Sequence, residues 1–372
     1  MLALRRFRWA LALAFVLTAS FSAHASANDD KKSAAANEKK SEARAAAPAT
    51  PAGRPVAWRD PGDISALDLA SGPCAAERAP APPFTFVEEV TLGTSPKFKV
   101  RDARGHTWSV KLGEEAQAET VATRLVWAMG YYAEETYYFD RVEVVNLPKL
   151  SRGQQFVEGR STVRGVRFEA RRDLGPRAAT WDWEQNPFTG TREFNGLKVL
   201  MALLGNYDIR EENNLIVAGR DEEGEPVARY LVSDIGATLG KVGGLGGKRS
   251  KNNLADYSAS KFVTGVENGF VKFDFNTKPK GFGFFASVFK PGYGKSQARK
   301  EKVMSNIPVE DARWMGTRLA RLSDAQLRDA FRAAGYAPAT ADGFVAAIRG
   351  RINQLTQLPA AATVAAGHNQ RR

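Results

Sequence analysis

The chain has 372 residues, of which 43% are hydrophobic and 25% charged. These values are typical of a soluble globular protein with one large domain or two ordinary ones. The formal net charge of +12 favours anionic partners such as nucleotide phosphates, anionic lipid or acidic polymers, but the basic residues are scattered and predict no specific nucleic-acid binding.

Cysteine and histidine are too few for several kinds of site. Cys74 is the only cysteine, so the fold cannot contain an internal disulfide. Of three histidines, only His106 falls within the expected domain, where it follows a glycine in a predicted turn. This scarcity argues against a zinc site and against a Ser-His-Asp triad, and we interpret His106 as structural.

Residues 1–25 have the pattern of a secretory signal peptide. Three arginines precede the apolar run 9–21, and residues 23–25 form a small-x-small cleavage site. The run is short for a membrane span, although a single uncleaved N-terminal anchor is the alternative. We therefore expect an exported protein, periplasmic or extracellular, that begins at Ser26 or Asn28 and keeps no stable membrane span. Loss of the three arginines would leave a net charge of +9.

The expected domain spans residues 58–358. Residues 26–57 are rich in Ala, Lys, Glu and Pro and predict a disordered linker. Residues 58–84 are rich in Pro and Gly and predict an irregular path over the surface. The Ala-rich, polar segment 359–372 predicts a disordered tail.

Three antiparallel strands are predicted at 84–92, 97–100 and 107–112, from alternating apolar residues separated by turn residues. The turn between the first two contains Gly93 and Ser95. Such a hairpin could cover nucleotide phosphates, and an ordinary meander is the alternative. These strands begin a β-rich N-lobe of about 84–160.

Lys111 lies near the end of the third strand, after apolar residues, where its side chain could reach phosphate oxygens. A helix is predicted over 114–129 from apolar residues at helical spacing. Glu115 and Glu119 lie in its first turns and could pair with Lys111. We prefer Glu119, because it adjoins the apolar face. Surface lysines and glutamates near helix starts are common, so the prediction depends on their order.

The middle of the chain is less distinctive. A strand pair is predicted within 131–158, at 137–139 and 142–145. A basic, turn-rich connection follows through 171–172. The Trp-Asp-Trp sequence at 181–183 predicts a packing or lid element, and packing is the commoner use of such aromatics.

A helix predicted over 194–204 leads directly into a loop with Asp208. The loop lies between a buried helix and a β-type triplet, where an unpaired carboxylate would be costly. Arg210 could offset its charge or meet a phosphate. Spacing favours Asn213 as a metal ligand five residues after Asp208, while the start of the next strand favours Asn214.

A second acidic turn follows at 234–236, with the sequence Asp-Ile-Gly. An Asp, an Asn five residues later, a hairpin and then Asp-x-Gly is the order found in kinase-type phosphotransferases. In that order Asp208 would orient the acceptor hydroxyl. The Asn and Asp234 would hold magnesium on the nucleotide phosphates.

These motifs resemble the atypical kinase superfold of phosphatidylinositol kinases, HipA-type serine/threonine kinases and secretory-pathway kinases of the Golgi casein kinase type. Those families carry Asp-Arg-His-x-x-Asn and a later Asp-x-Gly, whereas 208–213 reads Asp-Ile-Arg-Glu-Glu-Asn. The arginine is displaced by one position and the histidine is missing. The resemblance covers about 84–358 and, more narrowly, extends to exported bacterial proteins with the same lysine strand and Asn-Asn loop.

The rest of the chain predicts a C-lobe of about 190–358. Residues 241–298 mix Gly, Lys and aromatics, which suits a mobile activation-type or substrate-facing segment, with a long loop packed by its own aromatics as the alternative. Helices are predicted over 309–322, from a capping box at Ser323 to Gly335, and from an Asp342 cap onwards.

We therefore expect an α+β, two-lobed, kinase-like fold with a β-rich N-lobe and a mainly helical C-lobe. The expected chemistry is transfer of the ATP γ-phosphoryl group to a hydroxyl on protein, lipid or sugar, by a monomer that uses ATP and Mg²⁺. A catalytically inactive periplasmic binding or scaffold protein is the alternative, since a bacterial periplasm contains little ATP. A protein that binds anionic polymers is a third, based on charge alone.

Overall fold

The computed structural model describes residues 49–91, 93, 95–170, 179–242, 249–275 and 293–359, with the backbone alone for 293–297. One compact unit begins at Thr50. The predicted signal peptide, most of the predicted linker and the tail from residue 360 lie outside the described residues. Among the described helices, none is both long and apolar enough to cross a membrane.

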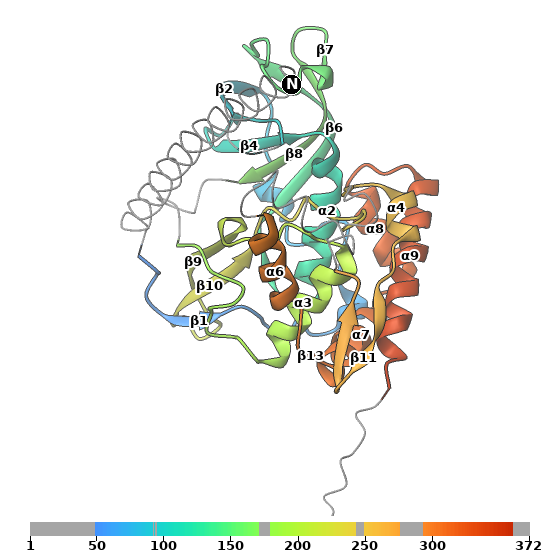
Figure 1. Ribbon diagram of the computed structural model, residues 1–372. Helices are drawn as coiled ribbons and strands as arrows, with labels where there is room; N and C mark the ends of the chain where they lie inside the picture. Colours follow the sequence, from blue (N-terminus) through green and yellow to red (C-terminus); the bar gives the residue numbers. More distant parts are fainter. Residues whose placement is uncertain are drawn as a thin grey trace, which may run out of the picture. The chain divides into compact units, whose positions relative to one another are not determined.

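Six strands form the sheet of the N-lobe, in the order β4-β3-β2-β6-β8-β7 (Figure 1). β4 also pairs with β8, so five of the strands make a closed ring of pairings. Closure removes exposed strand edges. The bounds are β2 Phe84–Val90, β3 Lys97–Arg101, β4 Thr107–Leu112, β6 Thr136–Val145, β7 Val157–Glu158 and β8 Thr162–Ala170.

The alternation of residues in β4 explains both its packing and the position of Lys111. Trp108, Val110 and Leu112 point into the apolar core of the N-lobe. Because side chains alternate along a strand, Lys111 points to the opposite face. Helix α2, Glu114–Ala128, follows directly and packs on β4 and β8. The lysine is therefore buried between a strand and a helix.

Most of the C-lobe is helical and surrounds a second apolar core. Its central helix α3 begins after a Thr191 side-chain cap and ends at Gly205, whose φ of 68° suits glycine. The predicted capping box at Ser323 is present at the start of α8. The helix bounds are α3 Arg192–Leu204, α4 Leu254–Ala259, α6 Tyr293–Val303, α7 Val309–Ala320, α8 Asp324–Arg332 and α9 Pro338–Thr356. The predicted α+β fold, β-rich first and mainly helical afterwards, is confirmed.

A second sheet contains β1, Arg54–Val56, paired in parallel with β10, Pro226–Val232. β10 also pairs with β9, Asn214–Arg220, and with the short β5, Tyr132–Ala133. The predicted disordered linker therefore does not extend to residue 57, because residues 54–56 form a strand. A three-residue strand has no detectable pattern of its own, and only pairing with β10 orders it.

Two further predictions for the N-lobe are wrong. The expected strand pair at 137–139 and 142–145 is one continuous strand, β6, because Arg141, between the two, continues the ladder with β8. The expected turn-rich connection before 171–172 contains β8. This strand carries the charges of Arg167 and Glu169 on a buried face, and it was overlooked for that reason.

Two corrections concern the C-lobe. The segment 241–298 contains α4 and a hairpin of β11, Val263–Glu267, and β12, Phe270–Phe273, which pairs with β13, Ile307–Pro308. The prediction of a long loop is wrong there, and the rest of the segment lies largely outside the described residues. The last helix begins at Pro338, a residue suited to the first turn of a helix. Asp342 is thus inside the helix and pairs with Arg328.

Irregular backbone at 58–84 agrees with the prediction, although this segment does not merely cross the surface. Ile64 and Leu69 are fully buried in the core of the C-lobe. Trp181 and Trp183 also belong to that core, and the Trp181 indole donates to the carbonyl of Leu231. The Trp-Asp-Trp sequence is therefore a packing element.

Candidate functional site

Lys111 lies at the centre of the candidate site. Its ammonium donates to Glu119 Oε2 at 2.8 Å and to Asp234 Oδ1 at 2.5 Å, and it lies 3.4 Å from Glu115 Oε2. The three carboxylates come from helix α2 and from the turn after β10. The structure thus brings together Lys111 and Asp234, which are 123 residues apart.

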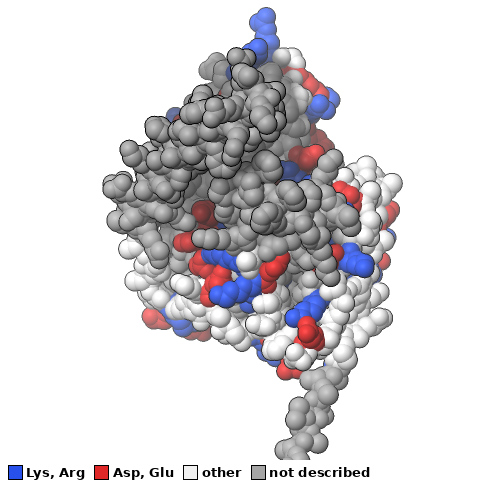
Figure 2. All heavy atoms as spheres, in the orientation of Figure 1, with Lys and Arg blue, Asp and Glu red and all other residues white. Residues whose placement is uncertain are grey.

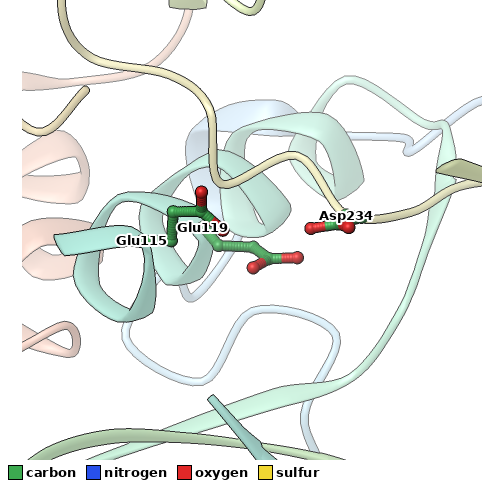
Figure 3. Close-up of side chains that lie close together, drawn as sticks. All are labelled: Glu115, Glu119 and Asp234. Atoms are coloured by element: carbon green, nitrogen blue, oxygen red, sulfur yellow. The ribbon is translucent and has the colours of Figure 1, made fainter. Parts of the chain in front are cut away.

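Local structure explains why the two glutamates lie on one side of the lysine. Glu115 and Glu119 are four residues apart on α2, so they share a helix face. Figure 3 shows both side chains projecting from α2, with Asp234 approaching from a separate loop. Glu119 was preferred because it adjoins the apolar face of the helix, and its carboxylate lies closer to the Lys111 ammonium than that of Glu115 does.

Backbone conformation and close packing explain why the Asp-x-Gly turn has aspartate at 234 and glycine at 236. Asp234 has a φ of 48°, a left-handed conformation that aspartate tolerates better than most residues. A Cβ on Gly236 would lie 2.8 Å from Cβ of Glu115 and 3.1 Å from Oε2 of Glu119. Only glycine lets the turn approach α2 closely enough for Asp234 to reach Lys111.

Arg167 is a site residue that the sequence analysis missed. It lies directly across from Lys111 in the β4–β8 pairing, so the two cations share one face. Its guanidinium lies 3.2 Å from Glu119 and 2.8 Å from Glu169, and it is 1% exposed. The available signal was a charged residue between Val166 and Phe168, the same pattern that drew attention to Lys111.

The charges of the site shift one another's pKa values. Burial alone would lower the pKa of Lys111, but Glu119, Asp234 and Glu115 outweigh it and raise that pKa above its usual range. Burial raises the pKa of Asp234, yet Lys111 and Arg167 more than compensate, so it falls below the usual value. Complete burial raises the pKa of Glu119, against the opposing charges of Arg167 and Lys111.

Carboxylate oxygens of Glu115, Glu119 and Asp234 lie within 4.8 Å of one another, as a metal site would require. The Lys111 ammonium contacts all three, however, and Lys251 contacts Glu115 at 2.5 Å. Positive charge is already present among these oxygens. These three carboxylates are therefore better suited to holding an ammonium group than a metal ion. We call Lys111 with Glu115, Glu119 and Asp234 the lysine pocket.

The loop after α3 forms a second cluster. Asp208 accepts two hydrogen bonds from Arg210, from Nε at 2.5 Å and Nη2 at 2.8 Å. Asn213 Nδ2 donates to the Asp208 carbonyl at 2.8 Å and to its Oδ2 at 3.2 Å. The buried Asn206 accepts from the Asp208 amide. Asp208 is held in one orientation, with 20% of its side chain exposed.

Asn213 and Asn214 lie in different environments. Asn214 is 1% exposed, and its side chain donates to the Trp181 carbonyl, so it faces the core. Both side-chain hydrogen bonds of Asn213 use the amide nitrogen, which leaves its oxygen as the atom able to bind a cation. The amide of Ser233 donates to the Asn213 carbonyl at 2.9 Å. This bond joins the Asp208 loop to the residue just before Asp234.

Gly93 and Ser95 lie at the turn between β2 and β3. The Gly93 carbonyl accepts from Arg152 at 2.9 Å, and its φ of 85° requires glycine or strain. Ser95 is buried close to Glu115. Lys97 extends from the next strand towards Gly93, and its charge also lowers the pKa of Asp234. Gly93 and Ser95 thus lie near the lysine pocket. Their contact with nucleotide phosphates stays a prediction.

The chain was compared with family models, curated proteins and solved structures. No protein-family model matches the chain, and no curated protein does. Among solved structures, the crystal structure of a Helicobacter pylori proinflammatory kinase, CtkA, matches 74% of this chain and 99% of its own length, with 13% sequence identity and a TM-score of 0.31. At that TM-score no residue role can be transferred, and each role depends on the contacts described above.

Proposed function

We propose that this protein transfers the γ-phosphoryl group of ATP to a hydroxyl acceptor, with magnesium. The observation that carries the proposal is the lysine pocket, in which Lys111 from a strand is held by Glu119 of the next helix and by Asp234 of an Asp-x-Gly turn. A buried ammonium held between carboxylates of two other elements is the arrangement that kinase-type enzymes use to position phosphates and metal.

Each residue of the site has a separate role in this proposal. Glu119 holds the buried Lys111 ammonium in a fixed position, from which it would bind phosphate oxygens. Asp234, whose side chain is 47% exposed, and the oxygen of Asn213 would hold magnesium, since hard cations prefer oxygen ligands. Bound magnesium neutralises charge on the phosphates. Asp208 would orient the acceptor hydroxyl and accept its proton through Oδ1, which keeps a lone pair beside its bond to Arg210, whereas Oδ2 also accepts from Asn213.

One observation favours the inactive alternative. Arg210 binds both oxygens of Asp208, so the carboxylate that would accept the acceptor's proton is already occupied by a bidentate partner. A protein that binds nucleotide without transferring phosphate would tolerate this arrangement. Transfer activity, rather than nucleotide binding, separates the two possibilities.

The proposal is tested by thermal unfolding with and without Mg-ATP, combined with a phosphate-transfer assay. Ligand at about 100 times its Kd should stabilise the protein by about 2.7 kcal/mol. Asp234→Asn should lose the metal-dependent stabilisation, whereas Asp208→Asn should keep it and lose transfer. Asp342→Asn, in an exposed ion pair outside the site, is the control.

Two results would count against the roles. Equal loss of Mg-ATP binding in Asp208→Asn and Asp234→Asn would contradict the division between acceptor and metal residues. Wild-type protein that shows no stabilisation by Mg-ATP would refute nucleotide binding. Binding without transfer would support the inactive alternative.

A further inference from the structure

Helix α6 is attached to the loop region of the site mainly through cations. Arg299 pairs with Asp182 and lies 3.3 Å from Glu184 through its Nε. Lys302 binds Glu184 at 2.6 Å. Lys300 Nζ donates to the carbonyl of Tyr207 at 2.5 Å.

These contacts place α6 next to the proposed catalytic loop. Tyr207 directly precedes Asp208, and the charges of Asp208 and Arg210 both act on Lys300. Lys300 is 6% exposed, and burial lowers its pKa to about 8. Figure 2 shows acidic and basic side chains intermingled on the face that is turned to the viewer in Figure 1.

The surface under α6 is rigidly connected to the site. We call Asp182, Glu184 and the Tyr207 carbonyl the acidic ledge. Asp182 lies between the buried Trp181 and Trp183. The Trp181 carbonyl holds Asn214, the residue after Asn213. A ligand on the ledge would thus be fixed relative to Asp208.

The contacts that hold α6 against the rest of the protein are of the kind that break and re-form easily. Arg299 and Lys302 have side chains that are 45% and 74% exposed, so their ion pairs are screened by solvent and salt. The helix has 11 residues, which is too short for stability on its own in water. Lys300 adds the cost of burying an amine whose hydrogen bond goes to a carbonyl.

We propose that the acidic ledge docks a basic polypeptide segment that carries the acceptor hydroxyl, and that α6 is an intramolecular occupant which competes with it. This inference rests on the proposed function and names the acceptor as a basic polypeptide. In the transfer step the acceptor oxygen forms a bond to the γ-phosphorus of ATP, the bond to the β,γ-bridging oxygen breaks and ADP leaves. The hydroxyl proton passes to Asp208.

The test uses a fluorescent peptide with the sequence of residues 293–303, which includes one serine, Ser296. Fluorescence anisotropy measures its binding to wild-type protein and to two double variants without nucleotide. Arg299→Ala with Lys302→Ala loosens the tethered helix, so the peptide should bind at least about tenfold tighter than to wild type. Asp182→Asn with Glu184→Gln also frees α6 but removes the ledge charges, so it should show no such gain. The control is Arg328→Ala, in an exposed ion pair of α8.

Equal peptide affinity in the two double variants would overturn the inference, and so would an affinity unchanged from wild type in the first. Because this readout needs no ATP, it can succeed or fail independently of the phosphotransferase proposal. Where transfer occurs, the first variant should lower KM for the peptide at unchanged kcat. A peptide with both Tyr293→Phe and Ser296→Ala, which has no hydroxyl side chain left, should accept no phosphate.

Charge reversal guards against a folding defect. Arg299→Glu with Lys302→Glu should raise hydrogen exchange in 293–303, and adding Asp182→Lys with Glu184→Lys should restore protection. Protection that is not restored by the second pair, in a protein with unchanged thermal unfolding, would show that these charges do not hold α6.

Discussion

Replacing Arg167 by methionine should destabilise the protein strongly, because it leaves two buried carboxylates without their shared partner. The guanidinium is 1% exposed and lies 3.2 Å from Glu119 and 2.8 Å from Glu169. Removing one member of a buried ion pair typically costs about 3–5 kcal/mol. Methionine retains most of the side-chain length, so this cost is mainly electrostatic.

The loss should depend on pH in a defined direction. Without Arg167, the pKa of Glu119 should rise further, so the folded variant binds more protons than the unfolded chain above a pH of about 4.3. Stability then falls as pH rises towards the folded pKa. The difference from wild type should be smaller at pH 5 than at pH 7.5 in urea unfolding.

Arg164 provides a matched control on the same strand. Its side chain is 55% exposed and 3.7 Å from Glu158, so Arg164→Met should cost less than about 1 kcal/mol. If Arg167→Met costs no more than Arg164→Met, or if its cost does not change with pH, the electrostatic account of the pocket is refuted.

Three other measurements follow from the structure. Gly236→Ala places a Cβ 2.8 Å from Cβ of Glu115 on α2 and should lower the free energy of unfolding in urea by about 1–3 kcal/mol. Gly350→Ala in α9, where the added Cβ meets open space, is the control and should be neutral or slightly stabilising. Equal effects of the two substitutions would contradict the close approach of the turn to α2. Lys300 has a pKa of about 8 when folded, below its usual value of 10.5, so the unfolded chain binds more protons between these values and stability should rise with pH there. The stability of Lys300→Met minus that of wild type should therefore fall between pH 7.5 and 9.5, and a difference that rises would show the opposite shift. N-terminal sequencing of exported protein should find a chain that begins at Ser26 or Asn28, and an intact Met1 would contradict a cleaved signal peptide.

Several features were predictable because they depend on neighbours in sequence. Alternation in β4 and helical spacing in α2 depend on short-range geometry, so the positions of Lys111 and Glu119 on adjacent elements could be inferred. The capping box at Ser323 and the end of α3 at Gly205 are equally local. These predictions needed no knowledge of the rest of the fold.

Other features are decided by contacts between distant segments. The charges of Arg167 and Glu169 look like those of an exposed loop until β8 pairs with β4 and β6, which buries them against Glu119. β1 is too short to show a pattern and exists through pairing with β10.

The periodicity of the residues predicted an α+β domain and placed Lys111 and Glu119 on adjacent elements, and the order of the acidic motifs named Asp208 and Asp234 as candidates. Only the tertiary structure decided that Lys111 meets Asp234, that Asn214 faces the core while Asn213 stays beside Asp208, and that Arg167 balances the buried charge. The physical reason is that periodicity reports which face of an element is buried. The partner that compensates a buried charge can come from any part of the chain.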